Sequence, residues 1–207
     1  MSSAEAGRRC ADWRNAGRTV VFTNGHFDLL HLGHVDLLQR ARALGDVLVV
    51  GLNSDASTRQ LKGPQRPIVP QAERAAMLAA LACVDLVVIF DELTANQLVA
   101  ALRPDIYVKG GDWQPDEDRA APPEAAVVHS YGGQVCFLPY LPGHSSSDLI
   151  QTILDRFAPR ASSVPSDPSA CFPHRSVWTA KSTPLPPDLA VRREQMRDAG
   201  SDPLDAS

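Results

Sequence analysis

Residues 23–34 read TNGHFDLLHLGH, and the interpretation of the whole chain starts from this stretch. It begins at the end of a run of β-branched and aromatic residues, 19–23 (TVVFT), which is typical of a buried strand. Beyond it, apolar residues recur mostly in steps of three from Val35 to Leu44, which predicts a helix that Gly45 ends. The motif therefore connects a strand to a helix N-terminus, where free backbone N–H groups and the helix dipole favour an anion.

The residue types in this loop indicate phosphate chemistry. Gly33 allows a ligand to approach the backbone closely. His31 and His34 would lie beside the helix N-terminus, where two imidazoles can donate to phosphate oxygens as negative charge develops. The alternative is a polar loop with two surface histidines, but the spacing His-x-Gly-His between a strand and a helix favours the phosphate site.

The chain as far as residue 158 continues the same alternation of strand and helix. Near-continuous apolar strands and short loops favour the α/β class, with a doubly wound, Rossmann-like sheet of five parallel strands and helices on both faces. Ligands are expected at the carboxyl ends of the strands. After the first pair, the expected strands are 46–52, 85–90, 106–108 and 134–138, and the expected helices are 70–82, 95–102 (capped by Thr94), 125–131 and 146–157.

Composition divides the chain into three parts. Residues 1–17 are polar without a clear period and are expected to form an N-terminal extension. Residues 18–158 are expected to form one domain. Residues 159–207 contain 8 of the chain's 17 prolines and little apolar surface, so a disordered tail is expected there.

Bulk properties exclude several classes of protein. The net charge of −4 gives no electrostatic reason to expect nucleic-acid binding. No apolar run is long enough for a membrane span, and no N-terminal stretch has the apolar core of a signal peptide. The four cysteines contain no CxxC pair, so no zinc site is expected and the compartment is expected to be reducing. We therefore expect a cytoplasmic protein that binds neither nucleic acid nor a membrane.

A second group of cations lies in residues 59–67 (RQLKGPQRP), followed by Glu73 and Arg74. Arginine can grip a phosphate at two points, whereas lysine acts as a point charge. Lys62 and Arg66 are therefore candidates for holding phosphate groups. A solvated basic loop is the alternative for this stretch taken alone.

Two further clusters follow expected strands. Residues 107–113 (YVKGGDW) place Lys109 at a strand's carboxyl end, where Asp112 could orient it or meet a sugar hydroxyl; a simple turn is the alternative. Residues 143–150 (GHSSSDLI) place serines at the start of the last helix. Such serines satisfy free N–H groups as caps, and the same geometry binds phosphate.

These motifs together resemble the cytidylyltransferase-like nucleotidyltransferases, whose signature is His-x-Gly-His. The resemblance implies a nucleotidyltransferase domain over 18–158 that transfers a nucleotidyl group with loss of pyrophosphate. It implies no metal ligand from the protein. The residues to which it gives roles are, for catalysis, His31, His34 and Lys109; for nucleotide binding, Thr23, Asn24, Gly25, His26, Phe27, Gly33, Arg74, Ser145, Ser146 and Ser147; for the substrate phosphate, Lys62, Arg66 and Asp112; and, behind the site, Asp28.

Within this family, the stretches 52–55, 61–63, 66–67 and 108–112 are similar to the adenylyltransferase domains of ADP-heptose synthases. That similarity implies transfer of AMP from ATP, with Mg²⁺, to D-glycero-β-D-manno-heptose 1-phosphate or a related sugar 1-phosphate. It also implies a homodimer. These domains often have cysteine at the position of His26, and the sugar-kinase domain of the bifunctional enzymes is absent here, so a separate kinase is expected.

Two alternatives stay open at this point. A CTP-dependent enzyme acting on glycerol 3-phosphate or phosphoethanolamine would share the same histidine chemistry. The second alternative is a non-catalytic nucleotide sensor. Such a protein would not need paired histidines and lysines to stabilise a transition state.

Overall fold

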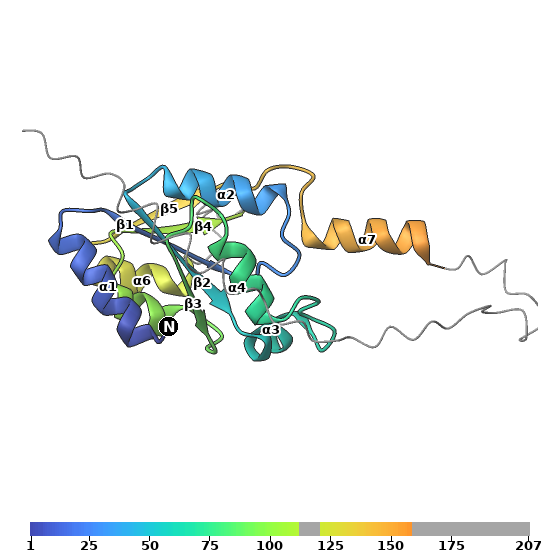
Figure 1. Cartoon of the computed structure of the whole chain (residues 1–207), viewed down its shortest axis with the longest axis horizontal. Coiled ribbons are helices and arrows are strands. Elements are labelled where there is room, and N and C mark those ends of the chain that lie inside the picture. Colours follow the sequence, from blue (N-terminus) through green and yellow to red (C-terminus); the bar gives the residue numbers. More distant parts are fainter. Residues whose placement is uncertain (112–120, 159–207) are drawn as a thin grey trace, which may run out of the picture. The chain divides into compact units, whose positions relative to one another are not determined.

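The computed structural model describes residues 1–111 and 121–158. Its five strands form one all-parallel sheet in the order β3-β2-β1-β4-β5 (Figure 1). The strand order reverses beside β1, which is the doubly wound arrangement, and the expected fold class is confirmed. Asp112 and the tail 159–207 lie outside the described residues. The strands are β1 (Val20–Gly25), β2 (Val47–Asn53), β3 (Leu86–Phe90), β4 (Ile106–Gly110) and β5 (Gln134–Leu138).

Two hydrophobic clusters cover the two faces of this sheet, because side chains alternate along each strand. In β1, Phe22 belongs to one cluster and its neighbour Val21 to the other. The first cluster is completed by α1 (Ser3–Asn15), α5 (Asn96–Leu102) and α6 (Pro123–Ser130), and the second by α2 (Leu32–Arg42) and α4 (Gln71–Ala79). Figure 1 shows α1 and α6 on the opposite side of the sheet from α2. The remaining helices are α3 (Asp55–Lys62) and α7 (Ser146–Phe157).

The N-terminal residues contribute to the core. Residues 3–15 form the helix α1, which belongs to the same compact unit as the sheet, Met1–Ala158. Ala6 and Cys10 on its inner face are fully buried, and this burial raises the pKa of the Cys10 thiol to about 11. The polar composition of the segment hid this helix, since only a narrow stripe of small side chains faces the sheet.

One helix was not expected from the sequence, and one expected cap was wrong. The basic stretch after β2 begins as the helix α3, whose N-cap Ser54 accepts a hydrogen bond from the N–H of Ser57. The N-cap of α5 is Ala95 rather than Thr94, and it has no capping side chain of its own. Instead, the carboxylate of Glu124, a residue distant in sequence, accepts the Ala95 N–H at 3.0 Å.

The last helix differs from the others in burial. None of the residues of α7 is buried, and Ile153, Leu154 and Phe157 are exposed apolar side chains. Across residues 1–111 and 121–158, no helix combines the length and the apolar character needed to cross a bilayer.

The contact between α1 and α5 generates a prediction about Gly7. A Cβ atom at Gly7 would lie 2.6 Å from the backbone oxygen of Ala101, which is closer than van der Waals contact allows. Helix propensity alone would make Gly7→Ala stabilising by about 1 kcal/mol. We expect instead that overpacking destabilises the protein by about 1–3 kcal/mol, measured by urea unfolding. The exposed Ala4→Gly change should lose up to about 1 kcal/mol as the propensity control. Stabilisation by Gly7→Ala would contradict the packing of α1 on α5.

Candidate active site

A cavity of about 580 Å³ opens at the carboxyl edge of the sheet, where ligands of such folds bind. Its walls come from the loop after β1, from α3, from the end of β4 and from the start of α7. Most of the residues singled out in the sequence meet here, although they come from four separate stretches of the chain. Those that line it are Asn24, Gly25, His26, Phe27, Asp28, His31, Gly33, His34, Lys62, Arg66, Lys109, Ser145, Ser146 and Ser147.

The two histidines of the motif lie against each other. His31 is the N-cap residue of α2, and its ring stacks on that of His34 with centroids 3.8 Å apart and planes inclined by 24°. The Nδ1 atom of each ring is buried and has no hydrogen-bond partner among the described residues. Gly33 permits this arrangement, because a Cβ there would lie 3.0 Å from the backbone oxygen of His144 and 3.1 Å from the His31 ring.

Both rings of the pair are held in the neutral form. Burial, followed by the neighbouring His31, lowers the pKa of His34 from 6.5 to about 4. Burial, followed by the nearby His144, also lowers the pKa of His31. At neutral pH each ring is therefore an uncharged imidazole with one N–H, and an arriving polyphosphate would favour protonation of the rings by its own charge.

His26 occupies a similar environment on the other side of the loop. Its Nδ1 atom lies 3.0 Å from the hydroxyl oxygen of Thr58, one of the α3 residues that line the cavity. Burial lowers the pKa of His26 to about 4, with smaller effects from the charges of Lys62, Arg74 and Arg66. His26 is therefore a neutral donor or acceptor at physiological pH.

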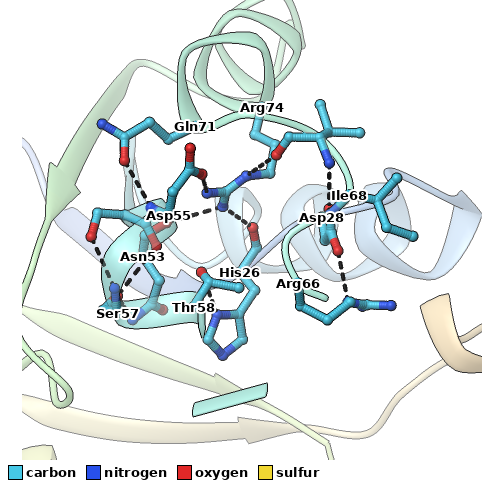
Figure 2. A network of polar contacts seen from close by, with 12 residues as sticks. His26, Asp28, Asn53, Asp55, Ser57, Thr58, Arg66, Ile68, Gln71 and Arg74 are labelled. Carbon is cyan, nitrogen blue, oxygen red and sulfur yellow. Dashed lines mark hydrogen bonds and ion pairs between the residues drawn. The ribbon is translucent and has the colours of Figure 1, made fainter. Parts of the chain in front are cut away.

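Arg74 does not line the cavity, which corrects the nucleotide-binding role predicted for it. Its side chain is fully buried and donates to the backbone oxygens of Val69, His26 and Asn53. Its remaining amino group pairs with Asp55 at 2.7 Å (Figure 2). The guanidinium is thus enclosed by the protein, makes four hydrogen bonds to it and does not reach the cavity. Thr23 is also fully buried in β1 and does not reach the cavity.

Asp28 joins the motif to the basic stretch. Its Oδ1 atom accepts the N–H groups of Ile68 and Val69 at 2.7 and 2.9 Å. Its Oδ2 atom forms an ion pair with Arg66 Nε at 2.8 Å, as Figure 2 shows. The carboxylate is almost completely buried, whereas a fifth of the Arg66 side chain is exposed. Asp28 therefore holds one edge of the Arg66 guanidinium beside the cavity.

Several cavity residues received no role from the sequence, and Glu124 is the charged one among them. Glu124, in the first turn of α6, is 2% exposed and lines the cavity. It forms an ion pair with Lys109 at 3.7 Å, and Lys109 also donates to the hydroxyl of Tyr107 at 3.2 Å. The Tyr107 hydroxyl donates to Asn24 at 2.8 Å. Acidic residues are common in the first turn of a helix, so its position in the sequence gave no signal of a buried site.

The neutral histidines generate a prediction about stability and pH. A histidine with a pKa near 6.5 in the unfolded chain and about 4 in the fold binds more protons when unfolded. The free energy of unfolding should therefore fall as the pH drops from 6.5 to 4. His26→Gln should remove about one of the protons taken up on unfolding near pH 5, measured by urea unfolding across this range. An unchanged slope in His26→Gln would contradict a neutral His26.

Comparison with known proteins places this geometry in a family. The family model for cytidylyltransferase-like proteins matches residues 22–152. The bifunctional protein HldE of Syntrophotalea carbinolica is 56% identical over 144 residues, 70% of this chain and 29% of that protein. HldE of Acidiphilium cryptum is 53% identical over 147 residues, 71% of this chain and 29% of that protein. The chain thus spans less than a third of the length of these relatives.

A solved structure from Thermoplasma volcanium, described as a lipopolysaccharide core biosynthesis protein, is 31% identical. It covers 60% of this chain and 98% of its own, with a TM-score of 0.49. The match to the family model includes the whole His-x-Gly-His loop, the basic stretch, β4 and the start of α7. The chain belongs to the cytidylyltransferase-like family of nucleotidyltransferases.

Proposed function

We propose that the protein transfers AMP from ATP to a sugar 1-phosphate, D-glycero-β-D-manno-heptose 1-phosphate or a close relative, and releases pyrophosphate. The observation that carries the proposal is the stacked pair His31 and His34 at the N-terminus of α2, inside a cavity that also holds Lys62, Arg66 and Lys109. The choice of ATP and of a heptose rests on the stretches similar to the adenylyltransferase domains.

The reaction requires no nucleophile from the protein. An oxygen of the sugar phosphate is already anionic and attacks the α-phosphorus of ATP in line, forming a P–O bond as the bond to pyrophosphate breaks. Catalysis then consists of positioning and of stabilising charge on the phosphate oxygens. His31 and His34 would donate to those oxygens, while Lys109 would neutralise the reacting phosphates from the end of β4.

The nucleotide's phosphates would lie between two helix N-termini. The helices α2 and α7 both begin at the cavity, and Ser145 caps α7 by accepting the Asp148 N–H at 3.0 Å. Free N–H groups and helix dipoles at both ends favour an anion there. Lys62 and the Arg66 guanidinium, held by Asp28, would bind phosphate groups from the opposite wall.

Magnesium fits this site only as a companion of the nucleotide. Among the described residues, no group of three His, Cys, Asp or Glu side chains could hold a metal ion. Of the carboxylates that line the cavity, Asp28 is occupied by Arg66 and by two backbone N–H groups. When bound, Mg²⁺ would neutralise charge on the triphosphate oxygens and keep most of its waters. The homodimer and the cytoplasmic location stay predictions.

Substitution of the paired histidines tests the chemistry. His31→Ala and His34→Ala should each lower kcat by about 10²–10³, the usual cost of one donor to a developing charge. The pyrophosphate-release rate measures this effect, and the melting temperature checks folding. His129→Ala removes an exposed imidazole from α6 and should leave kcat unchanged. Full turnover in either of the two cavity variants would refute the assignment.

The nucleotide and the acceptor are tested together. Purified protein is mixed with ATP or with CTP and with each of three acceptors: a heptose or hexose 1-phosphate, glycerol 3-phosphate, and phosphoethanolamine. Pyrophosphate release is expected with ATP and a sugar 1-phosphate. Release with CTP and glycerol 3-phosphate or phosphoethanolamine would replace the proposal by the cytidylyltransferase alternative. Nucleotide binding without turnover on any acceptor would instead identify a sensor.

A further inference from the structure

We infer that Glu124 recognises a hydroxyl group of the sugar acceptor, an inference that rests on the proposed function. Glu124 is the one carboxylate among the described cavity residues that keeps a hydrogen-bonding position open. Its Oε1 atom accepts the Ala95 N–H, but its Oε2 atom is buried and has no hydrogen-bond partner among the described residues. The neighbouring Tyr107 hydroxyl donates to Asn24 at 2.8 Å. Burial, followed by the charge of the nearby Glu124, raises the pKa of this hydroxyl, so it stays protonated beside the carboxylate.

The Lys109 ammonium lies 3.7 Å from Oε2, which is longer than a hydrogen bond, so this oxygen can still accept one from a ligand. A carboxylate accepts hydrogen bonds only, so the group that completes it must carry a proton. A phosphate is excluded by like charge. A ligand ammonium is disfavoured by Lys109, whose Nζ atom lies 3.7 Å from the same Oε2. A neutral donor remains, and the hydroxyl of a sugar fits it.

The topology assigns this hydroxyl to the acceptor rather than to the nucleotide. Glu124 is carried by α6, which packs on the sheet face covered by α1 and α5. His31 and His34 are carried by α2 on the opposite face. If the triphosphate lies against α2 and α7, Glu124 reaches the cavity from the opposite sheet face, and we assign that part of the cavity to the acceptor.

The experiment compares Glu124→Gln with the wild type in the ATP-dependent assay. Glutamine keeps the size of the side chain and an oxygen that can accept the Ala95 N–H, but it loses the charged acceptor. The KM for the sugar 1-phosphate should rise at least about tenfold, the usual loss for a hydrogen bond to a charged group. The KM for ATP should change by less than about twofold, because the interaction is with the other substrate. Glu73→Gln removes an exposed glutamate of α4 outside the cavity and should change neither value.

A second measurement does not depend on how well the variant folds. Wild-type protein is assayed with analogues of the sugar 1-phosphate that each lack one hydroxyl. With the wild type, one of these analogues should have a lower kcat/KM than the full substrate. The factor should be about the one by which Glu124→Gln lowers kcat/KM for the full substrate. With Glu124→Gln, the kcat/KM for this analogue should be little lower than that for the full substrate, because the two changes remove the same interaction.

The possible outcomes separate the two proposals. An unchanged KM for the sugar 1-phosphate in an active variant overturns the role of Glu124 and leaves the proposed function standing. A rise in the KM for ATP alone assigns the carboxylate to the nucleotide ribose, and a raised Mg²⁺ requirement assigns it to the metal; either result overturns the inference. A wild type inactive on every sugar 1-phosphate overturns the proposed function, and the inference with it.

Discussion

The enclosed guanidinium of Arg74 is the interaction on which the arrangement of the site depends. Taking one ion out of water costs on the order of several kcal/mol, so such a charge is tolerated only with a full set of partners. Arg74 has four such partners, the backbone oxygens of Val69, His26 and Asn53 and the carboxylate of Asp55. These partners belong to the loop after β1, the end of β2, the start of α3 and the segment before α4. One side chain thus sets the relative positions of the backbone segments that surround the phosphate cavity.

The same connection explains the unusual backbone of the loop. Phe27 has a φ of 45°, a conformation that is uncommon for residues other than glycine. Its two neighbours are held from outside, His26 by Arg74 and Asp28 by the N–H groups of Ile68 and Val69. The left-handed turn places the buried Phe27 ring 5.1 Å from the ring of the partly buried His34. Burial in turn keeps the histidines neutral, so the electrostatics of the cavity follow from the backbone geometry.

The sequence predicted the structure correctly where a residue pattern occurs in only one kind of structural element. Apolar runs such as 46–52 predicted the strands, and His-x-Gly-His after a strand predicted the histidine pair. Sequence reasoning failed where burial decides the role. Arg74 lies in a basic stretch and was assigned to the nucleotide, yet its partners are carbonyl groups up to 48 residues away along the chain. Glu124 follows two prolines at a helix start, a position typical of an exposed residue. The helix α1 was hidden because its buried residues are small.

The helices on the two faces of the sheet bring different kinds of polar side chain to the cavity. In the proposed reaction, the histidines at the start of α2 would donate to the triphosphate. Glu124 from α6, Thr58 from α3 and His26 from the loop after β1 offer uncharged or acceptor groups. A doubly wound sheet brings both sets to one edge, because every parallel strand ends there. The two sets are in contact, because Glu124 forms an ion pair with Lys109 at 3.7 Å. The histidine motif identifies the reaction class, whereas the contact proposed for the acceptor involves a residue that lies far from that motif in the sequence.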